Sequence, residues 1–267
     1  MVKLSKKKIN AIQSIFTFKE SKKIKKLFGD ADIIIANNVF NHSDKPLDFL
    51  EGVKHLLKKD AIFIFEQPNF TKGVLSLKFD QIYHEHISYF TVRNIRSLLN
   101  YSGLKMISIK KNGYHGGSLR TIATNSSSKL KEFNAGKLIK FENKSKIYNL
   151  RFYKDMMKKI MMKKINLLEK LIKLTQKGYV LSGIGAGAKS NTFLTFYGLN
   201  NNIIKFLTDS SKFKQNKYTP MTRIIIKDDN QLTKYKKIAC LILLWNISGI
   251  VIKKIKKINK NIKFIKT

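Results

Sequence analysis

Two short apolar runs flank a helical pattern between residues 31 and 66, and this arrangement constrains the fold more than any other part of the chain. The first run, ADIIIA, spans Ala31 to Ala36, and the second, AIFIFE, spans Ala61 to Glu66. Between them, from about Lys45 to Lys58, leucine and valine recur at helical spacing. Continuous apolar runs are typical of strands buried on both faces of a parallel sheet. The segment therefore predicts a strand–helix–strand unit of an α/β fold.

Polar clusters follow both predicted strands, at residues 37–42 and 66–69. Ligands of open α/β sheets bind beyond the carboxyl ends of the strands, so both clusters are candidate site residues. Further along, we expect a helix over 92–100, strands over 105–110 and 118–123, and a long amphipathic helix over about 145–176. A second, smaller Rossmann-like unit follows Gly178, with a glycine-rich turn, a helix to Leu199, strands near 203–208, 222–226, 238–245 and 263–265, and a helix over 248–258.

The basic residues give a formal net charge of +36, which suggests a polyanionic partner such as nucleic acid or an anionic membrane. Only five of them are arginine, the residue favoured for reading bases and gripping phosphate: Arg93, Arg96, Arg120, Arg151 and Arg223. The lysines are scattered over the whole chain, and asparagine and isoleucine, which share their AT-rich codons, are also abundant. We therefore interpret the charge mainly as lysine drift and expect no specific nucleic-acid partner.

Cysteine content and hydropathy exclude several classes of protein. The lone Cys240 excludes a disulfide framework and any zinc site built from several cysteines. No run approaches the length of apolar sequence that crosses a membrane, and Lys6, Lys7 and Lys8 interrupt any signal-peptide core. We expect a cytoplasmic protein without a membrane span.

The densest chemical cluster is Tyr83-His84-Glu85-His86. One interpretation is a metal site, for which a glutamate and two histidines supply ligands. The other is acid–base chemistry, because an imidazole beside a carboxylate and a phenol can take a proton from a carbon acid at neutral pH. Spacing alone does not choose between them.

Two glycine-containing loops are further candidates. In His115-Gly116-Gly117-Ser118 the glycines permit close approach of a ligand to the backbone. The turn Gly183-Ile184-Gly185-Ala186-Gly187, followed by Lys189, is typical of a phosphate-binding turn after a strand, although its GxGxG spacing differs from the dinucleotide motif.

Taken together, these segments resemble the sugar C-methyltransferases, which use S-adenosylmethionine to methylate a carbon of nucleotide-linked keto-sugars. The resemblance rests on ADIIIANNVFNH, FIFEQPNF, FDQIYHEHISYF, HGGSLR, GIGAGAKSNT, KFKQNKYTP and LLWN, in the family's order. It implies an incomplete Rossmann-like methyltransferase domain over 1–125, a connector and long helix over 126–178, and a Rossmann-like C-terminal domain over 179–267. Residues 10–30 would then supply a strand and its helix.

The resemblance also implies a mechanism, in which a proton is removed from the carbon next to the ketone and the enolate takes the methyl group. His86 would be the general base, oriented by Glu85. Tyr83 and His42 would donate hydrogen bonds to the sugar or its enolate oxygen. Asn38 would approach the methionine part of the cofactor. His115, Gly116, Gly117 and Lys189 would contact the substrate. This role for Tyr83–His86 disfavours the metal interpretation.

Three features of the family are missing: the zinc cysteines, the cofactor-binding glycine motif of the methyltransferase domain, and the acidic residue that binds the cofactor ribose. Their absence puts binding of S-adenosylmethionine by this chain alone in doubt, and we expect no zinc. The gene could be split or truncated, with another chain supplying the N-terminal half, or the protein could be degenerate. An open sheet edge would then require a partner or leave the chain poorly stable.

Two other functions compete with this one. A nicotinamide-dependent enzyme would use the Gly183 turn and needs an acidic ribose ligand about 20 residues further on, where Asp209 lies. A polyanion-binding module without catalysis would bind through its charge alone, with an affinity that falls steeply with salt.

Overall fold

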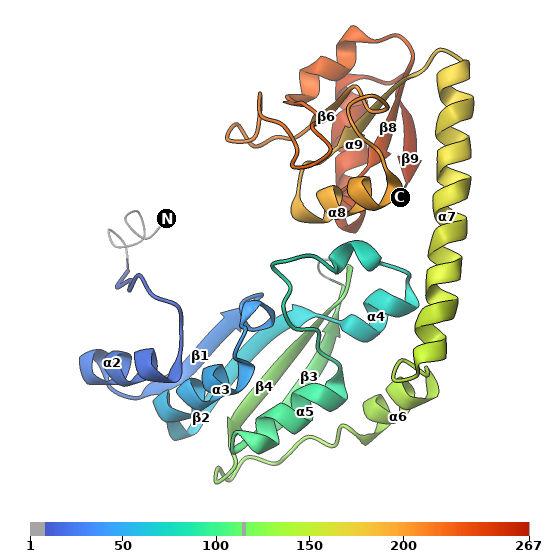
Figure 1. Cartoon of the computed structure of the whole chain (residues 1–267). Coiled ribbons are helices and arrows are strands. Elements are labelled where there is room, and N and C mark those ends of the chain that lie inside the picture. The colour runs from blue at the N-terminus through green and yellow to red at the C-terminus, as the bar shows by residue number, and fades with distance from the viewer. Residues whose placement is uncertain (1–8, 114–115, 267) are drawn as a thin grey trace. The chain divides into compact units, whose positions relative to one another are not determined.

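The computed structural model describes residues 9–113 and 116–266 and contains two compact α/β units (Figure 1). Unit 1 comprises Met1–Thr71, Ile87–Asn112 and Gly117–Ser145, and unit 2 comprises Lys72–His86, Gly113–Gly116 and Lys146–Thr267. The tyrosine–histidine cluster thus belongs to unit 2, whereas Asn38 and His42 belong to unit 1. The mixed α/β fold class predicted from the sequence is confirmed.

Unit 1 contains a four-stranded sheet in the order β1-β2-β4-β3. Strand β1 (Ala31–Asn37) runs parallel to β2 (Leu57–Pro68), and helix α3 (Pro46–Leu56) connects them, as the apolar runs predict. Strands β3 (Leu104–Asn112) and β4 (Ser118–Asn125) are antiparallel to each other, and β4 is also antiparallel to β2. The sheet is therefore mixed.

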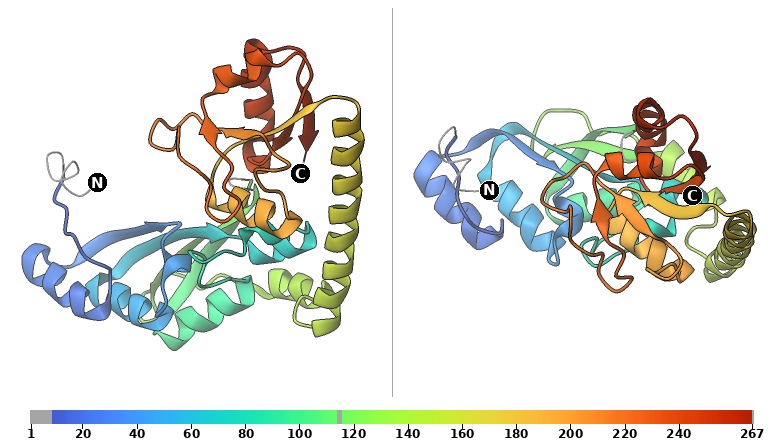
Figure 2. Two further views of the ribbon diagram at one scale, coloured as in Figure 1. Left: turned by 45° about the horizontal axis from the view of Figure 1, so that its top comes forward. Right: turned by 90° about the horizontal axis from the view of Figure 1, so that it is seen from above.

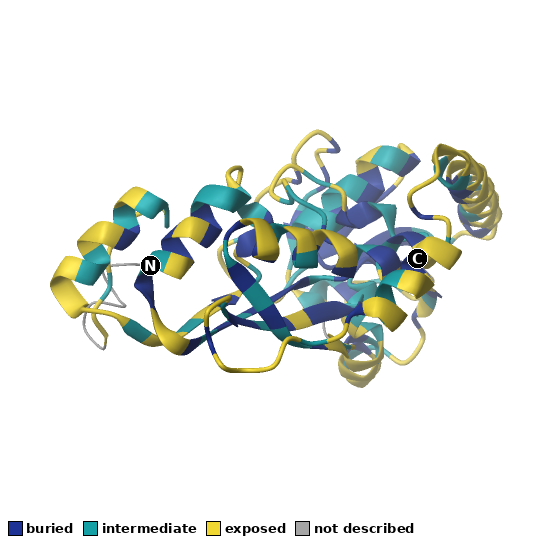
Figure 3. Ribbon diagram, turned by 90° about the horizontal axis from the view of Figure 1, so that it is seen from below, coloured by how far each residue is buried: buried dark blue, intermediate teal, exposed yellow. Residues whose placement is uncertain are grey.

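Helices α2 (Phe18–Phe28), α3 and α5 (Val92–Tyr101) lie along one face of this sheet (Figure 2). Each helix alternates buried and exposed positions, as expected of amphipathic helices over a core (Figure 3). The expected helix within residues 10–30 is present as α2, but the expected strand before it is wrong, because the described residues 9–17 form no strand.

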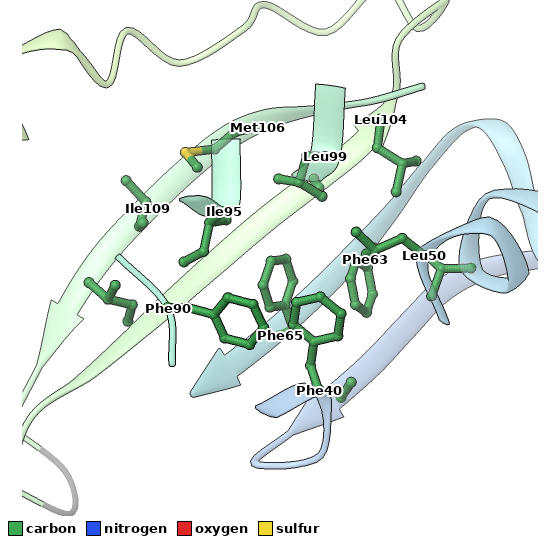
Figure 4. Packing of buried hydrophobic residues seen from close by; sticks show 14 of the residues in the cluster. Phe40, Leu50, Phe63, Phe65, Phe90, Ile95, Leu99, Leu104, Met106 and Ile109 are labelled. Atoms are coloured by element: carbon green, nitrogen blue, oxygen red, sulfur yellow. The ribbon is translucent and has the colours of Figure 1, made fainter. Parts of the chain in front are cut away.

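Aromatic rings fill the core between these helices and the sheet (Figure 4). Phe40 stacks on Phe90 with ring centroids 4.8 Å apart, and its edge meets Phe65 at 5.4 Å. Phe63 and Phe65 are fully buried on β2 and stack at 4.6 Å. Truncation of one such ring to alanine typically costs about 3–5 kcal/mol, so this cluster is a major source of stability for the end of β1.

The opposite face of the sheet exposes isoleucines from three strands. In the strand register Ile33 lies beside Ile62, and Ile35 lies beside Ile64, which in turn lies beside Ile122. Ile33 and Ile35 are 57% and 63% exposed. Strand β1 also forms an edge of the sheet and has one parallel neighbour among the described strands. Parallel strands are normally covered on both faces, so this apolar face is unusual for a parallel pair.

Unit 2 contains a five-stranded, wholly parallel sheet in the order β7-β6-β5-β8-β9. The strands are β5 (Val180–Ile184), β6 (Phe206–Thr208), β7 (Ile226–Lys227), β8 (Ile238–Ile242) and β9 (Lys263–Lys266). Helix α8 (Ala188–Tyr197) follows β5, and α9 (Ser248–Ile258) precedes β9. The order reverses beside β5, so the switch point of this Rossmann-like sheet lies between β5 and β8.

Two helices occupy the region predicted as a connector and one long helix. They are α6 (Gly136–Lys144) and α7 (Leu150–Gln176). Leu171 and Leu174 of α7 pack into the core of unit 2, but Leu150, Met157, Met161 and Ile165 of the same helix are exposed. Within the described residues, no helix combines the length and apolar character needed to cross a membrane. Short helical segments α4 (Phe70–Leu75), η1 (Phe40–His42), η2 (Phe79–Gln81), η4 (Asp229–Lys234) and η5 (Trp245–Ile247) complete the fold.

Replacement of Ile33 and Ile35 by threonine tests whether the exposed isoleucine face binds hydrophobic ligands. Because both side chains are largely exposed and threonine favours strands, we expect an unchanged melting temperature and weaker fluorescence of the dye 1-anilinonaphthalene-8-sulfonate. Ile250→Thr on α9, where the side chain is 71% exposed, is the matched control and should change dye binding less. Equal dye binding by the Ile33/Ile35 variant and the wild type would contradict this expectation.

Cys240 provides a test of the core of unit 2. The residue is fully buried on β8, and burial raises the pKa of its thiol to about 12. We expect no alkylation by iodoacetamide at pH 8 in the native protein and full alkylation in guanidinium. The unfolded thiol ionises above about pH 8.5, so the free energy of unfolding should fall as the pH rises beyond that value. Rapid alkylation under native conditions would show that β8 is not in the core.

Candidate active site

The predicted tyrosine–histidine cluster forms a hydrogen-bonded chain in the turn after η2. The Tyr83 hydroxyl and His86 Nε2 are 2.9 Å apart, and His86 Nδ1 is 2.9 Å from the main-chain oxygen of Gln81. A carbonyl oxygen only accepts hydrogen bonds, so Nδ1 carries the proton. In the neutral ring Nε2 is then the basic atom, and it accepts the hydrogen bond of the Tyr83 hydroxyl. The fold thus defines the tautomer of His86.

The structure adds a partner of His86 that the sequence did not indicate, the main-chain oxygen of Gln81. Glu85 was expected to orient His86, but its Oε1 instead lies 3.9 Å from His84 Nε2, and the side chains of Glu85 and His84 are 55% and 86% exposed. The backbone turn brings the Gln81 carbonyl to His86. Gln81 therefore orients His86 through Nδ1, and the orienting role of Glu85 stays a prediction.

A buried carboxylate and an aromatic cluster attach this segment to the core of unit 2. Asp80 is 4% exposed, and its Oδ2 accepts a hydrogen bond from the Trp245 indole nitrogen at 2.5 Å. The Phe79 ring lies 4.4 Å from the Phe196 ring and 6.2 Å from the Tyr197 ring of α8. Sequence reasoning did not single out Asp80 or Phe79, although both stand just before Tyr83.

Two lysines complete the surroundings of Asp80. The ammonium groups of Lys78 and Lys189 lie 4.4 Å and 5.4 Å from the centre of the Trp245 ring, within cation–π range. Burial lowers the pKa of both lysines, and the charge of Asp80 opposes that shift. Burial also raises the pKa of Asp80, against the Trp245 hydrogen bond and the two lysine charges. The cluster therefore balances a buried carboxylate with nearby cations.

A cavity of about 680 Å³ opens within unit 2, beside the turn that contains Tyr83 and His86. Residues Tyr83–Glu85 contribute one side of the cavity, and the start of α8 contributes another. Its lining residues are Tyr83, His84, Glu85, Ala186, Gly187, Ala188, Asn191, Thr192, Thr195, Phe196, Lys214, Pro220 and Met221. Its volume suits a small organic ligand, since such sites measure about 300–1,000 Å³. Lys189, predicted to contact substrate, does not line this cavity, whereas Lys214 does.

The glycine-rich turn after β5 binds an acidic residue of its own unit. Asp209 Oδ2 accepts hydrogen bonds from the Ala186 backbone at 3.0 Å and from Lys214 Nζ at 3.3 Å, and Oδ1 accepts one from the Ser211 backbone at 2.9 Å. Burial raises the pKa of Asp209, but these partners more than offset it, and the pKa is lowered overall. The carboxylate that a nicotinamide-dependent enzyme would use for ribose is thus engaged within the protein.

Tight packing also occupies the switch point between β5 and β8. Gly185 has φ +100°, and a Cβ atom there would lie 2.3 Å from Leu244. Gly116 has φ +87°, and its Cβ would lie 2.2 Å from the Trp245 ring. Both glycines are needed because protein side chains approach their backbone, and contact of Gly116 with a ligand stays a prediction. His115 lies outside the described residues. Gly117, with φ +127°, accepts a hydrogen bond from the Asn69 backbone.

In unit 1 the predicted polar residues follow β1. Asn38 has φ +51°, a conformation that asparagine tolerates, and its N–H donates to the Glu66 carbonyl at 2.7 Å. His42 ends the short helix η1, which the buried Phe40 ring attaches to the core. The Glu66 carboxylate, part of the second polar cluster predicted from the sequence, is 5% exposed and accepts hydrogen bonds from Ser118 and from Arg120 at 2.7 Å.

The described residues also bear on metals and on the methyl donor. No group of three or more histidine, cysteine, aspartate or glutamate side chains among them could hold a metal ion. Asn38 is the polar residue directly after β1 in unit 1, while the glycine-rich turn is in unit 2 and bonded to Asp209. Residues 9–113 and 116–266 therefore do not by themselves fit S-adenosylmethionine.

Comparison with known proteins identifies the class. Residues 113–267 match the family described as "C-methyltransferase C-terminal domain", and residues 4–109 match "Methyltransferase domain". The first match covers more than half of the chain, and the protein belongs to the C-methyltransferase family.

One curated relative is C-methyltransferase NovU of Streptomyces niveus, 26% identical over 95% of this chain. The match covers 60% of that protein's length. Among solved structures, a SAM-dependent methyltransferase from Anabaena variabilis ATCC 29413 is 13% identical over 46% of this chain and 63% of that chain, with a TM-score of 0.35. Magnesium protoporphyrin IX methyltransferase of Synechocystis PCC 6803 is 17% identical over 36% of this chain and 46% of that chain, with a TM-score of 0.30. At such TM-scores this likeness carries no argument about function.

Removal of the Trp245 hydrogen-bond donor tests how much its bond to Asp80 stabilises the segment before Tyr83. Trp245→Phe leaves the buried Asp80 carboxylate without its Trp245 hydrogen bond, and we expect a loss of about 1–3 kcal/mol in unfolding free energy. Urea denaturation measures it. The double variant Asp80→Asn/Trp245→Phe should recover part of the loss because the buried charge is gone. Stability of Trp245→Phe within about 0.5 kcal/mol of wild type, the usual effect of a surface substitution, would show that the bond is unimportant.

Proposed function

We propose that this chain is the catalytic and substrate-binding portion of an S-adenosylmethionine-dependent C-methyltransferase. Its substrate would be a nucleotide-linked deoxysugar methylated at the carbon next to a ketone, through an enolate. The observation that carries the proposal is the chain from Gln81 through His86 to Tyr83 beside the cavity of about 680 Å³. This arrangement is suited to removing a proton from a carbon acid.

The chemistry follows from the defined tautomer of His86. A neutral imidazole with its proton on Nδ1 has a basic Nε2, and the Gln81 carbonyl stabilises the imidazolium that forms when Nε2 gains a proton. The pKa of a histidine is ordinarily about 6.5, close to the operating pH that an efficient general base requires. Hydrogen bonds to the ketone oxygen would stabilise the enolate.

The cavity also supports an anionic, partly apolar ligand. Lys214, whose ammonium group is 3.3 Å from Asp209 Oδ2, and Glu85 contribute charged groups. Asn191, Thr192 and Thr195 contribute polar groups, while Phe196 and Met221 contribute apolar surface. A nucleoside diphosphate sugar combines negative charge, hydroxyl groups and a planar base, so its chemistry matches these groups. The net charge of +36 would assist its approach, and we place the reaction in the cytoplasm.

His42, Asn38 and the methyl donor enter the proposal through the family resemblance. His42 would donate a hydrogen bond to the sugar or its enolate, and Asn38 would contact S-adenosylmethionine. The donor would supply the methyl group to the enolate carbon. Because the described residues do not form its site, we propose that polypeptide outside residues 1–267 completes it, as a separate chain or as another segment. The uncovered isoleucines of β1 and the 60% coverage of NovU support this proposal.

Hydrogen–deuterium exchange tests the first half-reaction without a methyl donor. In deuterium oxide with a thymidine diphospho-4-keto-6-deoxyhexose, we expect the protein to exchange the protons next to the ketone, measured by proton NMR. His86→Ala should slow the exchange by about 10²–10⁴-fold, the usual contribution of a general base. His55→Ala, on α3 of unit 1, is the matched control and should keep wild-type exchange. No exchange above the uncatalysed rate in the wild type would refute enolisation by this chain.

A further inference from the structure

Tyr83, rather than His86, contacts the cavity. Tyr83 lines it together with its neighbours His84 and Glu85, whereas His86 is not among the lining residues. The phenol ring packs on the imidazole with centroids 4.2 Å apart, and its hydroxyl is bonded to Nε2. The basic atom of the histidine is therefore engaged by the phenol of a residue that lines the cavity.

Both ring nitrogens of His86 are committed in this arrangement. Nδ1 donates a hydrogen bond to the main-chain oxygen of Gln81, which is a buried residue, and Nε2 accepts one from the Tyr83 hydroxyl. The segment is attached through Phe79 and Asp80 to the core of unit 2. A substrate in the cavity would meet the Tyr83 oxygen first, since rotation of His86 toward it would break the hydrogen bond with Gln81.

We propose that Tyr83 is the catalytic residue that accepts the substrate proton and that His86 acts through it. This inference rests on the proposed function. As the C–H bond next to the ketone breaks, its electron pair forms the enolate and its proton moves to Tyr83 Oη. The O–H bond of Tyr83 breaks in the same step, and that proton moves to His86 Nε2. The products are an enolate, a neutral tyrosine and an imidazolium bonded to the Gln81 carbonyl.

A relay is needed because neither the Tyr83 phenol nor the His86 imidazole can by itself take the proton from a substrate in the cavity. A phenol alone is a poor base at neutral pH, since its pKa is about 10 when unperturbed. The Nε2 atom of His86 is the basic atom, yet it is engaged by the phenol, and His86 is not among the residues that line the cavity. Coupling them gives a group that contacts substrate and a final acceptor with a suitable pKa. After the transfer, Tyr83 again carries a proton and can donate a hydrogen bond to the enolate.

Tyr83→Phe separates this role from general-base catalysis by His86 alone. The substitution removes one oxygen and keeps the ring against His86. In the exchange assay with the same keto-sugar, we expect at least a 100-fold loss, comparable with that of His86→Ala. The double variant should lose little more, because residues that act as a unit are non-additive. Tyr101→Phe, with Tyr101 79% exposed in unit 1, is the matched control and should keep wild-type exchange.

Two further measurements distinguish a relay from a structural contact. Calorimetric affinity for the keto-sugar should be nearly unchanged in Tyr83→Phe, and ¹⁵N NMR should show the Nδ1–H tautomer of His86 in both proteins. Tyr83→Phe that exchanges within about threefold of wild type, while His86→Ala is inactive, overturns the relay and leaves the proposed function intact. A wild-type protein that does not exchange overturns the proposed function, and the relay with it.

Discussion

The burial of Asp80 against Trp245 is the constraint on which the arrangement of the candidate active site depends. A carboxylate removed from water must be paired, and here the indole N–H and two lysine ammonium groups supply the partners. Trp245 follows β8 in the chain, and Asp80 precedes the acid–base turn by three residues. The interaction therefore couples the parallel sheet of unit 2 to Tyr83 and His86, although 165 residues of sequence separate the two partners.

The same unit shows why a Rossmann-like sheet need not bind a dinucleotide. Asp209 stands after β6, where a ribose ligand is expected, but it accepts hydrogen bonds from the glycine-rich turn and from Lys214. Leu244 and Trp245 occupy the space next to Gly185 and Gly116. The glycines serve close packing between parts of the protein, and the cavity lies instead beside the start of α8 and the acid–base turn.

Unit 1 combines a well-packed core on one face of its sheet with an apolar surface on the other. Five phenylalanines, including Phe40 and Phe65, interlock beneath the helices. The isoleucines of β1 and β2 on the reverse side have the character of a buried parallel pair, but Ile33 and Ile35 are largely exposed. This surface is consistent with the partial coverage of NovU, in which a substantial part of the relative has no counterpart in this chain.

The sequence by itself determined the α/β class, the strand–helix–strand unit from residue 31 to 66, and the Tyr83–His86 cluster as the candidate site, because periodicity and dense motifs are local properties. Only the tertiary structure decided which groups touch. Gln81 accepts a hydrogen bond from His86, Lys214 lines the cavity, and the predicted strand before α2 is absent from residues 9–17. These outcomes depend on turns and on partners distant in the chain, such as Asp80 and Trp245, whose pairing no local pattern encodes.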